Sequence, residues 1–467
     1  MDRLPNEITH MVFAELKPCD VANLRLVCKT FSIVGLQYLV PRIHLIFNPG
    51  SFESLRQISE HPVVSQYVKA LDYEADALQD FETMEQWKKH LAEPNWWEEL
   101  PLYRLGDVPP GTSERELRAR RRELEKTRRK PHYMYRSAQL RRAYGKFRDY
   151  HQEQAVMRSY DYESDIIRDA FAKLPNLDTI RMSTECCVIP RTVAMERAFG
   201  GGLCMPYGNV GQKENCGVPQ LRSVLLAAAH TGLKLKSLEC GSVHWRIFAQ
   251  SPKIFHKFRD AVRSLTAIRL HIITFIQADG DGGDGHMEIP ECASLLEDHG
   301  RLRDLVTSAP NLEQLQIHFD WDYPYSPTNL KHIVGEFIWP CLTIASFGFI
   351  ETEEDPLLGF FKRHADSLKD IALDTIVLLP GGQWFRVWQA ARRILRLESA
   401  SMWGNLTSAT EEFDFGWSEN DGVRSGARNA VESYILAGGE APPLEHPTLT
   451  PYGVNEDADS DLESWYG

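Results

Sequence analysis

The chain has 467 residues, of which 43% are hydrophobic and 25% are charged, and its formal net charge is −13. These proportions are typical of a globular protein, and the negative charge argues against a surface that binds nucleic acid throughout. The sequence has no run of about 18 apolar residues, so we expect no membrane-spanning helix. We also expect no secretory signal, because polar residues interrupt the first apolar stretch.

The nine cysteines are scattered, odd in number and never spaced as C-x-x-C. This pattern predicts free thiols in a reducing compartment rather than a disulfide framework or a zinc site. We therefore expect a cytoplasmic or nuclear protein. Its length allows two or more domains or one long repeat array.

The chain opens with MDRLPNEITHMVFAELKPCDVANLRLVCKTF, which predicts compact helices. Pro5 suits the first turn of a helix. Apolar residues then recur at helical spacing, at Ile8, Met11, Val12 and Leu16. We expect Pro18 to end this helix and Asp20 to cap the next one. About 35 residues cannot bury so much apolar surface alone, so one face is expected to be offered to another protein.

This opening resembles an F-box, which begins with Leu-Pro and continues through an Asp-led turn to Leu-Arg-x-Val-Cys-Lys-x-Phe. The matching residues are Leu4, Pro5, Glu7, Ile8, Leu16, Asp20, Leu24, Val27, Cys28, Lys29 and Phe31. The resemblance implies a three-helix F-box at 1–45 that docks on the Skp adaptor of a cullin–RING ubiquitin ligase. The adaptor contacts that it implies are Leu4, Pro5, Glu7, Ile8, Leu16, Leu24, Val27, Cys28 and Phe31. The alternative is an ordinary helical hairpin that caps the following domain.

Residues 46–439 carry loose copies of L-x-x-L-x-L, whose last two apolar positions alternate as in a strand with one buried face. The copies are Val68-Leu71-Tyr73, Leu177-Ile180-Met182, Leu235-Leu238-Cys240, Leu265-Ile268-Leu270, Leu312-Leu315-Ile317, Ile344-Phe347-Phe349 and Leu368-Ile371-Leu373. Helix-like stretches such as HKFRDAVRSL lie between them. Successive copies begin between 24 and 109 residues apart, whereas regular leucine-rich repeats recur every ~20–29 residues.

We therefore predict an α/β fold, with the F-box followed by an irregular leucine-rich-repeat-like solenoid that has long insertions and binds substrate. An irregular α/β domain without a common repeat axis is the alternative. The wider chain resembles large F-box proteins of filamentous fungi, through HPVVSQYVKALDYEAD, a charged insertion and ESYILAGGEAPPLE.

The charged insertion near 113–148 has fourteen basic and four acidic residues, a net charge of +10. This insertion has three interpretations. It is a solvated charged helix, a nuclear localisation signal at RARRR and KTRRK, or a contact for an acidic substrate or nucleic acid.

The segment 440–467 has four prolines and an acidic run. It has too few apolar residues to build an element, so we predict a disordered acidic tail.

Enzyme motifs are poorly supported. Gly280, Gly282 and Gly285 satisfy G-x-G-x-x-G, but Asp281 and Asp284 would repel a pyrophosphate there. The chain has no P-loop, no H-E-x-x-H and no G-x-S-x-G. We therefore expect no catalytic residue, metal or cofactor, and no nucleic-acid or membrane partner.

Two functions remain from the sequence. The first is a substrate-recognition subunit of an SCF-type ubiquitin ligase, with an unknown protein substrate. The second is a non-catalytic binding scaffold whose F-box acts outside ubiquitination. Because loops at strand ends carry recognition in solenoids, we expect substrate contacts at Trp245, His318 and Trp321. Further candidates are Glu185, His244, Asp320 and Glu351. Alternatively, the two tryptophans cover the solenoid edge.

Overall fold

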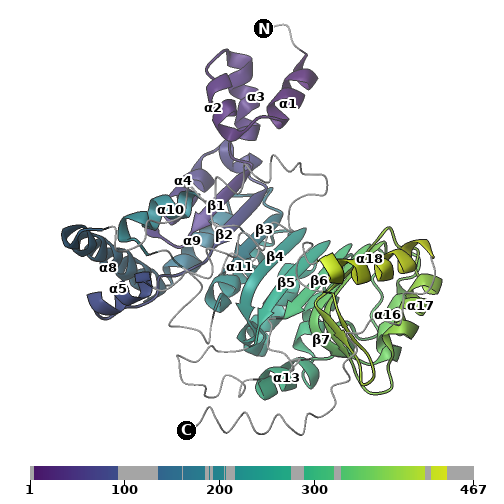
Figure 1. Cartoon of the computed structure of the whole chain (residues 1–467). Helices are drawn as coiled ribbons and strands as arrows, with labels where there is room; N and C mark the ends of the chain where they lie inside the picture. The colour runs from purple at the N-terminus through teal and green to yellow at the C-terminus, as the bar shows by residue number, and fades with distance from the viewer. Residues whose placement is uncertain are drawn as a thin grey trace, which may run out of the picture. The chain divides into compact units, whose positions relative to one another are not determined.

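The structure is a computed structural model of the whole chain (Figure 1). It describes residues 5–92, 135–159, 161–184, 193–204, 216–274, 289–319, 328–415 and 422–438, with Ile189 and Pro206. Contacts divide the chain into two compact units of mixed α/β structure, residues 1–312 and 313–467. In the described residues, no helix is both long and apolar enough to cross a membrane.

The first unit opens with three short helices, α1 (Asn6–Ala14), α2 (Pro18–Leu24) and α3 (Lys29–Leu39). Pro5 is the N-cap of α1. The expected roles of Pro18 and Asp20 were wrong. Pro18 begins α2 rather than ending α1, because a missing N–H costs nothing at the first helical position. Lys17 is the N-cap, and Asp20 lies in the first turn, where its charge stabilises the helix dipole.

Five parallel strands follow in the first unit, and each pairs with the next one along the chain. They are β1 (Arg42–Ile46), β2 (Ala70–Glu74), β3 (Thr179–Ser183), β4 (Ser237–His244) and β5 (Ala267–Ile273). The register aligns the predicted triplets in two rows, Leu71-Ile180-Leu238-Ile268 and Tyr73-Met182-Cys240-Leu270. Strand β1 begins at residue 42, so the boundary expected at 45 falls inside a strand.

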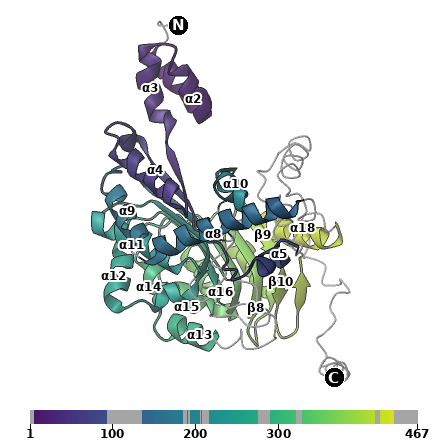
Figure 2. The ribbon, with the colours of Figure 1, turned by 90° about the vertical axis from the view of Figure 1, so that its left-hand side faces the viewer.

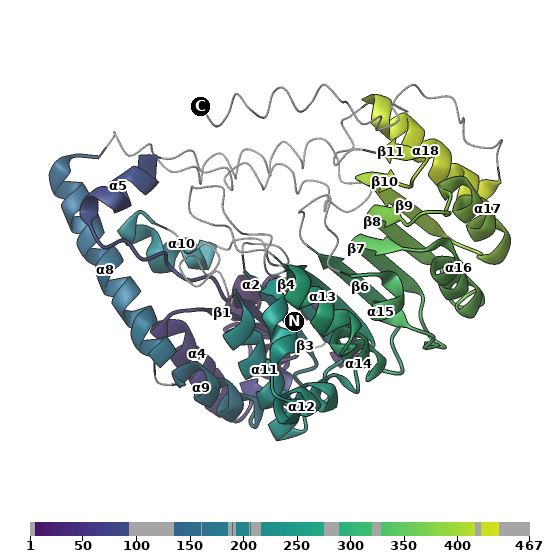
Figure 3. The same cartoon turned by 90° about the horizontal axis from the view of Figure 1, so that it is seen from below.

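Both aligned rows are apolar and lie on the same face of the strands. Helices pack on that face and bury both rows. The covering helices are α4 (Pro49–Glu60), α9 (Tyr162–Phe171), α11 (Val218–Thr231) and α12 (Pro252–Val262) (Figure 3). The unit also contains η1 (Val64–Tyr67), η6 (Trp245–Ala249), α13 (Ile289–Glu297) and α14 (Arg301–Thr307).

A second helical group in the first unit surrounds a separate core that includes Trp87, Phe147 and Phe199. Its elements are α5 (Met84–Ala92), α8 (Ser137–Ser159), α10 (Val193–Phe199) and η4 (Gly200–Gly202) (Figure 2). The basic insertion expected near 113–148 is described only from residue 135, where it leads into α8. That helix continues to Ser159, because Phe147, Gln154 and Met157 bury one side along its length.

The second unit repeats the alternation of parallel strand and helix, in strands β6 (Gln314–Phe319), β7 (Ile344–Thr352), β8 (Asp370–Leu378) and β9 (Ser399–Trp403). Short strands β10 (Asn405–Thr407) and β11 (Glu412–Asp414) form an antiparallel pair, and β10 lies beside β8. The helices are α15 (Leu330–Val334), α16 (Glu354–Arg363), α17 (Trp384–Ile394) and α18 (Gly422–Ala437). Glu432 of α18 accepts a hydrogen bond from the Met402 N–H of edge strand β9 at 2.9 Å.

One predicted triplet was placed wrongly. The register aligns Ala345 and Phe347 with the apolar triplet positions of β6 and β8, so Ile344-Phe347-Phe349 is shifted by two residues. Alanine is too small to signal a core position in the pattern. Phe349 instead lies in the left-handed backbone region, at φ 57°. The predicted tail at 440–467 lies outside the described residues.

Candidate functional site

The three N-terminal helices form a module with its own small core. Four buried side chains compose it, Phe13, Val21, Phe31 and Val34. The Phe13 ring meets Phe31 edge-on, with ring centroids 5.6 Å apart, and stacks on Tyr38 at 6.0 Å. Cys28 caps α3, since its sulfur accepts a hydrogen bond from the Phe31 N–H at 3.5 Å. The core therefore fixes how the helices pack without using most of the module's apolar residues.

The outer surface of this module is strongly apolar. On α1, Ile8, Met11 and Val12 share the side opposite Phe13 and are 42%, 65% and 46% exposed. Leu26 and Val27 follow α2, and Ile33 lies on α3; their exposed fractions are 86%, 56% and 67%. Six of the ten large apolar side chains that are exposed among the described residues therefore lie in this short segment. Such clustering is typical of a protein–protein interface.

The structure separates the adaptor-contact residues expected from the sequence into two groups. Exposed residues are Pro5, Glu7, Ile8 and Val27. Leu16, Leu24 and Cys28 are half-buried against the module core, and Phe31 belongs to that core. Leu4 lies outside the described residues. The second group can therefore shape the module, whereas the first is accessible to a partner.

Sequence reasoning did not include Met11, Val12, Leu26 or Ile33 among the contact residues, although all four are exposed. Met11 and Val12 were detectable, because they lie on the same helical stripe as Ile8. Leu26 and Ile33 alternate with core residues in the sequence. No spacing rule separates them from inward-facing positions before the fold is known.

The expected substrate-contact residues lie in different surroundings. Trp245 follows β4 as expected, but it is only 3% exposed, so its side chain packs inside the first unit. His318 of β6 is half-buried, and its Nε2 lies 2.7 Å from the Ser346 hydroxyl. Trp321 lies outside the described residues.

The further candidates are no more accessible as a group. His244 is buried, and burial lowers its pKa to about 4, so its imidazole is neutral near pH 7. Glu351 is half-buried, whereas Glu185 and Asp320 lie outside the described residues. The strand-end residues that the structure describes, Trp245, His318, His244 and Glu351, therefore do not form one exposed site.

The face of β1–β5 opposite the covering helices carries charged side chains that the triplet pattern did not predict. They align across neighbouring strands as His44, Asp72, Arg181, Glu239 and Arg269. Each lies between the two apolar positions of its strand, so aligning the triplets would have revealed the row. Opposite charges on adjacent strands stabilise a sheet, and they also make this face polar.

Asp72 is the centre of this charged row. Its side chain is fully buried beneath Arg42 and Arg181, and the Arg181 Nε donates a hydrogen bond to its Oδ1 at 2.8 Å. Burial alone would raise the pKa of Asp72, but the hydrogen bonds and charges of Arg181 and Arg42 outweigh it and lower that pKa. The two guanidinium groups are therefore held in fixed positions on the sheet.

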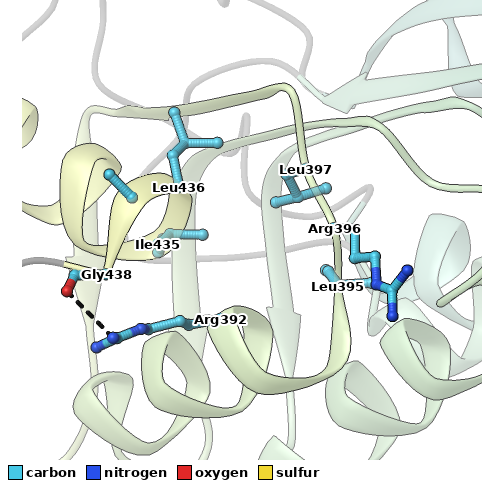
Figure 4. Close-up of a pocket in the computed structure, with 8 residues that line it drawn as sticks. Arg392, Leu395, Arg396, Leu397, Ile435, Leu436 and Gly438 are labelled. Carbon is cyan, nitrogen blue, oxygen red and sulfur yellow. Dashed lines mark hydrogen bonds between the residues drawn. The ribbon is translucent and has the colours of Figure 1, made fainter.

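A shallow pocket lies in the second unit at the C-terminal ends of α17 and α18, between Arg392, Arg396 and Leu436 (Figure 4). Arg392 donates a hydrogen bond to the Gly438 carbonyl at 3.1 Å. Its charge therefore offsets the negative dipole ends of these helices. The lining residues include no carboxylate and no nucleophile, so they do not form an acid–base or covalent site.

In the part of the chain that the structure describes, no three His, Cys, Asp or Glu side chains gather in a metal-binding arrangement. The glycine-rich sequence at 279–286 lies outside that part. Residues 1–39 match the family model of the F-box-like domain. Comparison with curated proteins gives no match. Together with the exposed apolar face, the family match identifies an N-terminal module for protein interaction.

Proposed function

Starting from an N-terminal F-box-like domain, we propose that the chain is a substrate-recognition subunit of an SCF-type cullin–RING ubiquitin ligase. In this proposal α1–α3 dock on a Skp adaptor, and the strand–helix region recruits a protein for ubiquitination. F-box proteins are generally non-catalytic adaptors, and the described pocket offers no acid–base machinery. The alternative keeps the same docking but uses the chain as a scaffold outside ubiquitination.

The apolar surface of the module is the observation that carries this proposal. The core of α1–α3 is already closed by Phe13, Val21, Phe31 and Val34. The exposed side chains around it therefore need another protein to remove them from water. Burying three such side chains supplies several kcal/mol, at about 25 cal/mol per Å². We place the adaptor contact on Ile8, Met11 and Val12 of α1 and on Leu26, Val27 and Ile33.

The remainder of the chain supports a substrate-binding array. From β1 to β5 in the first unit and from β6 to β9 in the second, successive strands are parallel and are joined by helices, as in a leucine-rich-repeat-like solenoid. In the first unit, α4, α9, α11 and α12 cover the face of the strands opposite the charged row (Figure 3). The described cysteines are free thiols, which supports a cytoplasmic or nuclear location.

Co-expression with the Skp adaptor tests the docking step. The variant Ile8→Lys/Met11→Lys places two charges on the outer face of α1 and leaves Phe13 in the core. We expect it to fold but to lose co-purification with the adaptor. Ile338→Lys is the matched control, because Ile338 is also exposed, at 56%, but lies in the second unit. Adaptor binding by the double variant at the wild-type level would contradict the proposal.

A reconstituted ligase separates the two functions. The complex of chain and adaptor is mixed with the cullin–RING core, E2 and ubiquitin, and ubiquitin transfer to captured proteins is measured. A substrate receptor supports transfer that depends on α1–α3. Intact adaptor binding without recruitment of the cullin–RING core would instead favour the scaffold.

A further inference from the structure

The N-terminal half of α8 is strongly basic on its outer side. Arg141, Arg142, Lys146 and Arg148 are all exposed, and no acidic residue occurs between them. In the described residues none of the four is paired with a carboxylate. Arg148 donates a hydrogen bond to the Phe81 carbonyl at 3.4 Å, which leaves its charge uncompensated. Four positive charges therefore remain on one helix of a protein whose net charge is −13.

Helical spacing arranges these side chains around Gly145. Arg141 and Arg148 lie on one side of it and Arg142 and Lys146 on the other, while Phe147 faces the opposite way into the core. We call these four residues and Gly145 the basic face. Like charges at i and i+4, as in Arg142 and Lys146, repel each other and destabilise a helix.

Gly145 also lowers the stability of α8, and contacts among the described residues do not explain why a glycine is present. Glycine inside a helix destabilises it relative to alanine, because its backbone loses more conformational freedom on folding. A Cβ at Gly145 would have no neighbouring atom within 4 Å. By contrast, a Cβ at Gly202 would lie 3.2 Å from the Phe147 Cα, so packing against the other side of α8 does account for that glycine. Packing among the residues that the structure describes therefore gives no reason for Gly145.

We propose that the basic face of α8 binds an acidic segment of the protein substrate, with Gly145 allowing its backbone to approach the helix closely. The positive charges supply electrostatic complementarity, and the missing side chain supplies room at their centre. This inference rests on the proposed function, because it names the class of protein that the chain recruits.

The surroundings favour an acidic protein segment over nucleic acid. The face extends from Arg141 to Arg148, about 10 Å along the helix at 1.5 Å per residue, which spans few phosphates. The aromatic side chains of α8, Tyr144, Phe147 and Tyr150, pack into the core around Trp87 rather than lying outward to stack on bases. The net negative charge of the chain also opposes a long polyanion.

Fluorescence anisotropy on the full chain bound to its Skp adaptor tests the proposal. The probe is a short fluorescein-labelled oligoglutamate peptide, and a single-stranded oligonucleotide of equal charge is the second probe. Arg142→Glu/Lys146→Glu reverses two charges of the basic face. Lys253→Glu/Lys257→Glu is the matched control on α12, because these lysines are also exposed and four positions apart.

We expect the α8 double variant to weaken peptide binding by roughly tenfold or more and the α12 variant to leave it unchanged. Gly145→Ala should weaken binding severalfold although it stabilises the helix. Equal losses in both charge variants, or none in the α8 variant, would overturn the proposal. So would tighter binding of the oligonucleotide than of the peptide. Adaptor binding is measured on the same samples, so its failure would refute the proposed function separately.

Discussion

The N-terminal module and the strand array of the first unit use apolar residues in opposite ways. The module buries four side chains in its core and exposes six large apolar ones. The array buries its aligned apolar rows under helices and places charged residues on the opposite face of the strands. The array thus buries its apolar rows within the chain, whereas the module leaves apolar side chains exposed to a protein partner. The comparison separates an apolar surface suited to protein docking from a charged strand face.

Removing one ring from each core is the strongest test of this comparison. Phe13→Ala should cost about 3–5 kcal/mol, because Phe13 is buried against Phe31 and Tyr38. A core of four side chains cannot absorb that loss, so α1–α3 should unfold while the array remains folded. Hydrogen exchange should rise within residues 5–39 alone.

The control is Phe258→Ala on α12, where the ring is 1% exposed inside the array. It should lower the unfolding free energy of the array and leave exchange in α1–α3 nearly unchanged. If Phe13→Ala unfolded the array as well, the module and the array would form one cooperative unit, and the comparison would fail.

The array also contains a buried carboxyl that should make its stability depend on pH. Burial raises the pKa of Glu163 to about 7, which the nearby Tyr73 hydroxyl partly opposes. Because the folded state favours the protonated form, the unfolding free energy should fall as pH rises from about 4.5 to 7. Glu163→Gln should remove this loss and stabilise the protein by about 3 kcal/mol at most near pH 8.

Urea denaturation at about pH 4 and pH 8 measures this effect. Little difference between Glu163→Gln and the wild type is expected at the lower pH. A variant less stable than the wild type at the higher pH would show that Glu163 is ionised and well paired in the fold.

The charged row should respond to pH in the opposite direction. Asp72→Asn removes the carboxylate that holds Arg42 and Arg181, and it should cost ~1–3 kcal/mol near pH 7. Both arginines are partly exposed, so water reduces the penalty. Because the pKa of Asp72 is lowered in the fold, its contribution should disappear as pH falls below about 4.

Thermal melts across this pH range test the row. The difference between the wild type and Asp72→Asn should be largest near neutral pH and should shrink in acid. A difference independent of pH would mean that the side chain matters through packing rather than charge.

The sequence predicted elements whose signals are local. Helical spacing revealed the N-terminal helices, and period-two alternation located β2 to β6 and β8. It did not reveal β1 and β9, and it misplaced the pattern in β7, where alanine occupies a core position. The F-box pattern also predicted an N-terminal F-box module, which the family match at residues 1–39 confirms.

What the sequence did not predict depends on register and packing. Asp72 and Arg181 are 109 residues apart, and only strand pairing brings them together. Trp245 was expected at a binding surface or at the solenoid edge, and its side chain is buried within the first unit. Leu26 and Ile33 cannot be distinguished from core residues until the packing of α1–α3 is known.

Hydrogen exchange of the full chain with and without the Skp adaptor tests the central claim most directly. We predict strong new protection within residues 5–39, centred on α1 and on the segment around Leu26 and Val27, with exchange in β1–β5 unchanged. Protection confined to the strand array, or no protection around α1 at saturating adaptor, would contradict the assignment of the apolar module surface as the docking site.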